Sequence, residues 1–322
     1  ANTPIWAMSF PFLVLLMVIN ALFRAHGDAI TASLAMITAA AVNIAFNPIL
    51  IFGWGPIEGF GTAGAATATL IGRVFAAFGV VVIAIYAGYL RKCGSLLAGL
   101  QNSIRTVTEV GAPAAFSNAI NPAGMALVTA AVATLGDAAV AGFGAATRIQ
   151  SLAIVAMLAL SAGIGPVVGQ NWGARKQDRA QTALLQSWFF CLAYGTGLAL
   201  VFFFFADAFA QTIASDKEAA GYARQYLLIV GWTLFGYGIL ATANAAMNAR
   251  SKAVYSMGLS LGRIFAIYLP LAWLGVLALG YSGVLLAAAT ANIAAVAGSV
   301  WCCRQTKLLP TRLSSALEVT SN

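Results

Sequence analysis

The sequence predicts an all-α membrane protein, a polytopic bundle of about nine transmembrane helices. Two features of composition lead to this prediction: hydrophobic residues make up 61% of the 322 positions and charged residues only 8%, with a mean hydropathy of +0.88. Soluble domains carry about 25% charged residues, so a soluble fold is excluded. The third observation is that the apolar residues fall in runs of about 20 or more, the length that a helix needs to cross the hydrocarbon core.

Nine apolar runs are expected to be these helices, because each is bounded by charged residues or by Gly, Pro or Asn. They cover residues 4–25, 31–53, 61–90, 111–135, 138–169, 182–206, 222–248, 253–279 and 283–303. If they alternate in direction, one side of the membrane receives most of the basic residues, including Arg91, Arg175, Arg250 and Arg304. The positive-inside rule assigns this side, with the tail 304–322, to the cytoplasm.

The polar segment 91–110 is expected to be a cytoplasmic connection between two lobes, residues 1–90 and residues 111–303. Internal similarity supports this division: Gly64 and Gly283 each follow a short turn and open an alanine-rich helix, and they are 219 positions apart. A repeat of about 220 residues is the size of one six-helix half of a transporter. The alternative is that alanine-rich helices resemble each other by composition alone.

The composition excludes several classes of function. One His and four Cys, without a CxxC or a His pair, are too few for a zinc, haem or disulfide framework. An enzyme inside the membrane would need converging His, Asp, Glu or a Ser–His pair, and the single His26 lies at a turn. The net charge of +8 follows from basic cytoplasmic loops and does not require a nucleic acid. We therefore expect no enzyme, no metal beyond Na⁺ and no nucleic-acid partner.

A series of short motifs runs along nearly the whole chain. They read NIAFNPILIF at 43–52, GTAGAATAT at 61–69, GAPAA at 111–115, ATRI at 146–149 and GPVVGQNWGAR at 165–175. In order and spacing they resemble the multidrug and toxic compound extrusion (MATE) family, with its N-x-x-x-D-P-x-x-I and P-x-x-G-Q-N-x-G-A signatures. The resemblance implies a two-lobed fold of twelve helices, of which this chain would hold helices four to twelve and lack the first three. It also implies an integral protein of a bacterial-type inner membrane, and we expect a monomer.

Small polar residues inside the first three predicted helices suggest a cation site. Asn20, Asn43 and Thr69 lie at similar depth below the loops, and Asn47 shares the helical face of Asn43 because it follows four residues later. The family resemblance implies that Asn20, Asn43, Asn47 and Thr69 bind the coupling cation, with Asn47 in the place of the family's Asp. An amide can coordinate Na⁺ but cannot titrate, so proton coupling through Asn47 is excluded. The alternative is that these amides only join helix to helix.

The second lobe has no central carboxylate, but it offers side chains for a substrate cavity. The candidates are amides, a thioether, an aromatic ring and a cation inside the predicted helices, namely Asn118, Asn121, Met125, Arg148, Tyr237 and Asn244. Met and aromatic side chains adapt to varied apolar cations. The alternative is that Met and aromatic residues face lipid or core. For Arg73, Arg148 and Arg263 we expect structural bonds to helix-end carbonyls.

The resemblance implies a secondary active multidrug efflux transporter, which exchanges organic amphipathic small molecules for Na⁺ or H⁺ by alternating access. No cofactor other than the coupling ion is expected, and the other partners are membrane lipids. Two alternatives remain open. A lipid-precursor flippase of the same superfamily would be favoured by a basic central cavity, to which Arg73, Arg148 and Arg263 could contribute. The other is a truncated remnant that inserts but does not transport, since a lobe without three of its helices is not expected to work alone.

Overall fold

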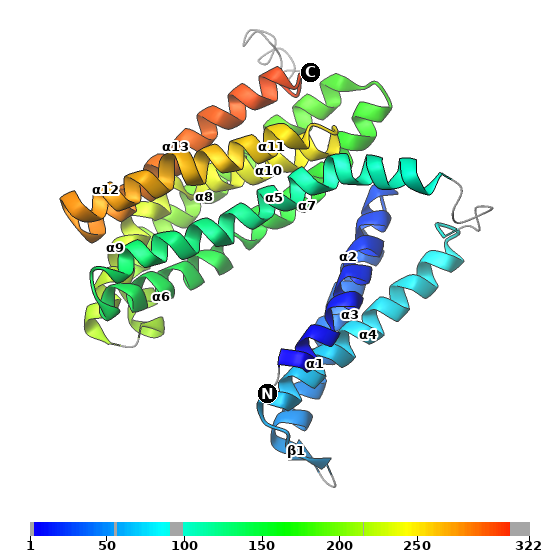
Figure 1. The fold of residues 1–322 in the computed structure, drawn as a ribbon, viewed down its shortest axis with the longest axis horizontal. Helices are drawn as coiled ribbons and strands as arrows, with labels where there is room; N and C mark the ends of the chain where they lie inside the picture. The colour runs from blue at the N-terminus through cyan, green and yellow to red at the C-terminus, as the bar shows by residue number, and fades with distance from the viewer. Residues whose placement is uncertain (1–2, 55–56, 91–98, 215, 310–322) are drawn as a thin grey trace. The chain divides into compact units, whose positions relative to one another are not determined.

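The computed structural model describes residues 3–54, 57–90, 99–214 and 216–309, and nearly all of them are helical (Figure 1). The chain divides into two compact units, Ala1–Ala98 and Gly99–Asn322. The described residues contain eight helices that are long and apolar enough to cross a membrane, or nine if one bent pair counts as a single span. The all-α membrane fold predicted from hydropathy is therefore confirmed.

The first unit is built from α1 (Thr3–Met8), α2 (Phe10–Ala25), α3 (Ala29–Phe52) and α4 (Thr62–Tyr86). Asp28 caps α3 by accepting a hydrogen bond from the Thr31 N–H at 3.0 Å, and hydrogen bonds from the Thr31 side chain and backbone hold the pKa of the Asp28 carboxyl below its usual range. Two short antiparallel strands, β1 (Gly53–Trp54) and β2 (Ile57–Glu58), lie between α3 and α4. The helix α4 packs against both α2 and α3, so a small core forms between the three long helices.

The second unit is a bundle in which α10 has a central place, since it contacts α7, α8, α11 and α13 (Figure 1). Its elements are α5 (Leu100–Ala133), α6 (Asp137–Ala153), α7 (Val155–Gly173), α8 (Gln177–Ile213), α9 (Lys217–Val230), η1 (Gly231–Thr233), α10 (Leu234–Ala249), α11 (Ala253–Leu261), η2 (Gly262–Tyr268), α12 (Leu269–Leu279) and α13 (Tyr281–Gln305). The segment η2 is a π-helix that joins α11 to α12 within one span.

Two elements differ from the sequence prediction. The predicted helix 138–169 is a pair, α6 and α7, bent by 46° near Ile154. The predicted connection 91–110 is helical from Leu100 onward, because α5 continues through the polar residues before the membrane span. Residues 91–98 of that connection and residues 310–322 of the tail lie outside the described residues.

Small residues let the helices of both units approach closely. A Cβ added at Gly64 would lie 2.0 Å from the Leu50 carbonyl oxygen, and one added at Gly283 would lie 2.1 Å from the Gly275 carbonyl oxygen. Each contact joins the two helices of a hairpin, α3 to α4 and α12 to α13. Each of the two hairpins, α3 with α4 and α12 with α13, therefore has a close backbone contact at its glycine.

Large apolar side chains remain exposed on the outside of the helices. On α8, Phe202 is buried in the core while Phe203, Phe204 and Phe205 are exposed. In water such a surface would be an aggregation hazard, but in a bilayer the lipid tails solvate it. The exposed aromatic residues thus agree with an integral membrane protein.

Candidate functional site

Three of the four predicted cation ligands form one hydrogen-bonded cluster between α3 and α4. Asn47 donates from Nδ2 to the Asn43 Oδ1 at 3.0 Å, and Asn43 donates from Nδ2 to the Thr69 Oγ1 at 3.2 Å. Thr69 in turn donates to the Ala65 carbonyl oxygen one turn back at 3.0 Å. Gly72 allows this arrangement because a Cβ there would lie 3.4 Å from the Asn43 Cβ and 3.0 Å from the Ala39 oxygen. We call Asn43, Asn47 and Thr69 the N-lobe cluster.

The fourth predicted ligand, Asn20, is buried on α2 and is not hydrogen-bonded to the N-lobe cluster. Its side chain is only 2% exposed, and within the described residues neither its Oδ1 nor its Nδ2 has a partner. The Asn47 Oδ1 is also buried and has no hydrogen-bond partner among the described residues. A buried carbonyl oxygen without a donor is costly, and a cation would satisfy it. The first unit therefore contains two buried amide oxygens that have no donor among the described residues.

A fixed positive charge lies one turn below the N-lobe cluster. Arg73 follows Thr69 by four residues on α4 and donates to the Ser9 Oγ at 2.5 Å. Its guanidinium also lies 5.8 Å from the centre of the Trp6 ring. The expectation that Arg73 binds a helix-end carbonyl is wrong, because its partners are side chains.

The second unit holds a larger polar network, with Arg263 at its centre. Arg263 donates from Nη1 to the Asn121 Oδ1 and from Nη2 to the Asn292 Oδ1, both at 3.0 Å. Asn292 in turn donates to the Thr233 Oγ1 at 3.1 Å. The guanidinium lies 5.4 Å from the centre of the Tyr237 ring. For Arg263 too, the expected bonds to helix-end carbonyls are replaced by bonds to side-chain amides.

A row of serines continues this network along α5 and α11. The Ser117 and Ser260 hydroxyls are 2.7 Å apart, and Asn244 donates to the Ser260 Oγ at 3.0 Å. Ser117 precedes Asn121 by four residues, and Ser260 precedes Arg263 by three, so each pair lies on one helical face. The facing polar stripes explain why α5 and α11 pack together with so many hydroxyl and amide groups between them.

A cavity of about 300 Å³ opens beside this network, between α5, α7 and α10. Four of the six residues predicted for a substrate cavity line it, namely Asn118, Asn121, Tyr237 and Asn244. The other two are placed elsewhere: Met125 packs against the core of the unit, and Arg148 is exposed on α6. The cavity is thus polar at Asn118, Asn121 and Asn244, and apolar at Leu158 and Leu240.

The sequence reasoning missed several residues of the site. Ser117, Ser161 and Asn248 also line the cavity, and Asn292 binds Arg263. The four-residue spacing of Ser117 and Asn121 could have indicated the α5 stripe. Nothing in the sequence around Asn292, an amide in an alanine-rich helix, indicated its partner.

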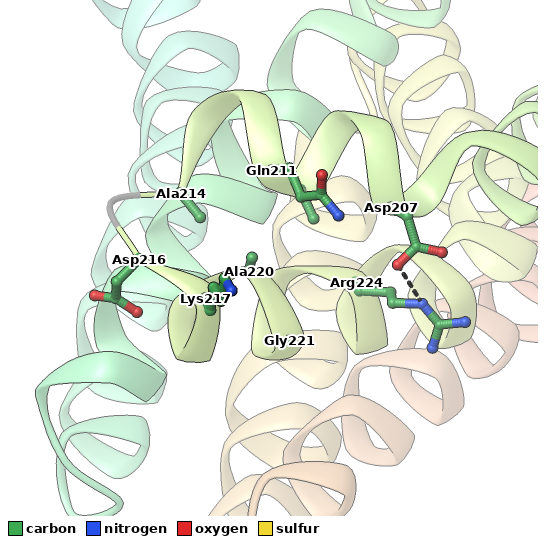
Figure 2. A pocket seen from close by; sticks show the side chains of 9 residues that line it. Asp207, Gln211, Ala214, Asp216, Lys217, Ala220, Gly221 and Arg224 are labelled. Atoms are coloured by element: carbon green, nitrogen blue, oxygen red, sulfur yellow. Dashed lines mark ion pairs between the residues drawn. The ribbon is translucent and has the colours of Figure 1, made fainter.

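A second hollow of about 510 Å³ lies between α8 and α9 (Figure 2). Its main interaction is an ion pair between the Asp207 Oδ1 and the Arg224 Nε at 2.8 Å. Both side chains are about half exposed or more, at 67% and 48%, so solvent screens the pair and its contribution to stability is small. This hollow offers no buried group that would bind a ligand specifically.

Comparison with known proteins agrees with this geometry. The MatE family model matches residues 113–274. The chain is 33% identical to the FAD transporter of Shewanella oneidensis over 89% of this chain and 64% of that protein. It is 24% identical to the probable multidrug resistance protein NorM of Thermotoga maritima, over 80% of this chain and 55% of that protein. Among solved structures, a mutant of the Vibrio cholerae MATE transporter VcmN matches 95% of this chain and 69% of that chain with a TM-score of 0.90 and 25% identity.

One of these curated relatives is named a transporter and the other a probable multidrug resistance protein, and the chain spans less than two thirds of the length of both. The family model covers half of the chain, and the two-lobed fold of the matched structures is the one that the motifs predicted. The chain belongs to the MATE family of membrane transporters.

Proposed function

We propose that this chain forms part of a secondary active transporter, which exports amphipathic organic compounds by alternating access in exchange for an inward-moving cation. The observation that carries the proposal is the presence of two separate polar clusters inside apolar helices, one in each unit. Burying so many amides in a membrane is costly unless they bind one another or a ligand. A coupled transporter needs both a cation site and a substrate site.

The N-lobe cluster and Asn20 are the proposed cation site. Amide oxygens are neutral and hard, so they suit Na⁺, and none of these four side chains titrates near neutral pH. The unpartnered oxygens of Asn20 and Asn47 support this role. Among the coupling ions expected for the family, these residues favour Na⁺ over H⁺.

The cavity between α5, α7 and α10 is the proposed substrate site. Its volume of about 300 Å³ is at the lower end of the range for small-molecule pockets. The names of the relatives point in two directions, multidrug export and FAD transport, so they leave the charge of the substrate open. A lipid-precursor flippase remains the second candidate, and the observation that favours it is the buried Arg263, which donates to the cavity residue Asn121.

Flux into or out of proteoliposomes that hold the whole transporter of which this chain forms part tests the proposal. We would use two pyrene probes that share one ring system, one with a sulfonate group and one with a trimethylammonium group. At least one probe should move against its gradient when a Na⁺ gradient is imposed, and the ionophore monensin should abolish this movement. The variant Asn43→Leu should lower the Na⁺-dependent rate by about tenfold, because it removes the amide that joins Asn47 to Thr69.

The control is Thr38→Val, also on α3, since the Thr38 hydroxyl is exposed and bonds only the Leu34 carbonyl oxygen of its own helix. It should transport like the wild type. Failure of both probes to move, or movement that monensin does not change, would refute the proposed function. A flippase would instead move a lipid-linked probe and neither pyrene compound.

A further inference from the structure

We propose that the cavity between α5, α7 and α10 selects anionic over cationic substrates, and that Arg263 is the residue that determines this selectivity. The inference rests on the proposed function only in taking the cavity as the substrate site. It goes further by fixing the charge that the substrate carries: a phosphate, sulfonate or carboxylate group on an apolar body.

The positive charge of Arg263 has no counter-charge among the described residues. Its two hydrogen bonds go to neutral amides, and its Nε is fully buried without a partner in the described structure. The two ion pairs of the described residues lie elsewhere, at Arg105 with Glu109 and at Arg224 with Asp207. An unpaired charge inside a membrane is among the most costly groups that a helix can carry.

The helices around the cavity supply no carboxylate near it. The sequence has no acidic residue between Glu218 and Glu318, a stretch that includes all of α10 to α13. It also has none between Asp137 and Asp178, which includes α7. The acidic residue on α5, Glu109, lies twelve positions before Asn121 and pairs with Arg105. A cationic substrate would therefore meet a positive field with no anion to offset it.

Arg263 contacts the lining of the cavity through Asn121. A guanidinium group only donates hydrogen bonds, so the Asn121 atom that it meets must be the carbonyl oxygen. The NH₂ group of Asn121 is then the group that remains to bind a ligand. An NH₂ group donates to an anionic oxygen and repels a cation, so Arg263 turns this wall residue toward anions.

Tyr237 is the aromatic residue among those that line the cavity. Aromatic rings commonly bind organic cations through their negative faces. Here the Arg263 guanidinium already lies 5.4 Å from the ring centre, so the ring is engaged by a resident cation. The side chain that would best recognise a cationic drug is thus occupied.

The backbone around Arg263 is also unusual, because Arg263 lies in the π-helical segment η2. Such segments are rare and occur frequently at functional sites. Together with the apolar lining from Leu158 and Leu240, the geometry fits a ligand with an anionic head and a compact apolar body.

Binding of the two pyrene probes to the full chain in lipid nanodiscs tests this inference without requiring transport. Fluorescence anisotropy at fixed ionic strength would give the two dissociation constants. The wild type should bind the sulfonate at least about tenfold more tightly than the trimethylammonium probe. The variant Arg263→Gln should lower this ratio by about tenfold, because the charge is lost while an NH₂ donor remains.

A second variant guards against misfolding of the first. Asn121→Asp keeps Arg263 and places a carboxylate against it, so it should also abolish the preference for the sulfonate. The control Lys176→Gln removes one positive charge at an exposed position of the turn before α8 and should leave the ratio unchanged. Equal or tighter binding of the trimethylammonium probe by the wild type would overturn the inference, and so would an unchanged ratio in Asn121→Asp. Loss of flux with the binding ratio intact would count against the proposed function alone.

Discussion

The N-lobe cluster and the network around Arg263 are built from the same kinds of side chains, but only one of them contains its own cation. In the second unit, the oxygens of Asn121 and Asn292 both accept from a guanidinium group. In the first unit, the oxygens of Asn20 and Asn47 are buried without a donor, and the fixed charge of Arg73 is bonded to Ser9 instead. The amide oxygens of the second unit thus accept from a tethered cation, whereas two amide oxygens of the first unit have no donor among the described residues.

This comparison assigns different tasks to the two clusters. A tethered cation cannot be exchanged across the membrane, so the second unit cannot couple ion flow through these amides. It can set the charge of what enters the neighbouring cavity. The proposed function requires the amides of the first unit to bind and release Na⁺ during the transport cycle.

The largest expected effect comes from removing the tethered cation. We expect Arg263→Met to lower the free energy of unfolding by about 2 kcal/mol, because the oxygens of Asn121 and Asn292 would lose their donors while buried, and this loss outweighs the relief of removing an unpaired buried charge. Chemical denaturation in detergent would measure this change. The control Arg224→Met breaks an exposed ion pair and should cost about 1 kcal/mol or less. Equal stability of Arg263→Met and wild type would mean that the guanidinium does not organise the network.

A smaller effect should follow from changing the open cluster. Asn47→Asp replaces an amide by a carboxylate of the same shape at the oxygen that has no partner. We expect Na⁺ to bind about tenfold more tightly at pH 8, because the charged form attracts the ion. As the pH falls through the pKa of this carboxylate, a proton replaces Na⁺ and the gain is lost.

The Na⁺-dependent shift in melting temperature at pH 8 and at pH 5 would measure this change. In the wild type, residue 47 should cause no difference between the Na⁺-dependent shifts at pH 8 and at pH 5, because an amide does not titrate. A pH-independent Na⁺ response in Asn47→Asp would place the ion away from residue 47.

The fold could be predicted from the sequence because hydropathy and helix length determine the spans directly. The bend near Ile154 could not, since residues 152–157 contain neither Gly nor Pro and the apolar run is continuous. The π-helix at Arg263 was equally hidden, because the residues of η2 carry no local motif that indicates it.

The candidate sites were predictable where partners are close in sequence. The shared face of Asn43 and Asn47 follows from their spacing, and their hydrogen bond confirms it. The bond between Asn43 and Thr69 required only a hairpin of known depth. The partners of Arg263 come from α5 and α13, far apart in the chain, so no spacing rule could identify them. Whether the four predicted ligands bind a cation together stays a prediction.

The most direct test of the division between the two units is to locate a heavier monovalent cation. Crystals grown with Rb⁺ in place of Na⁺ would reveal it by anomalous diffraction. We expect an anomalous peak within coordination distance of the Asn47 or Asn20 carbonyl oxygen, and none between Asn121 and Asn292. A peak between Asn121 and Asn292, with Arg263 displaced, would contradict it.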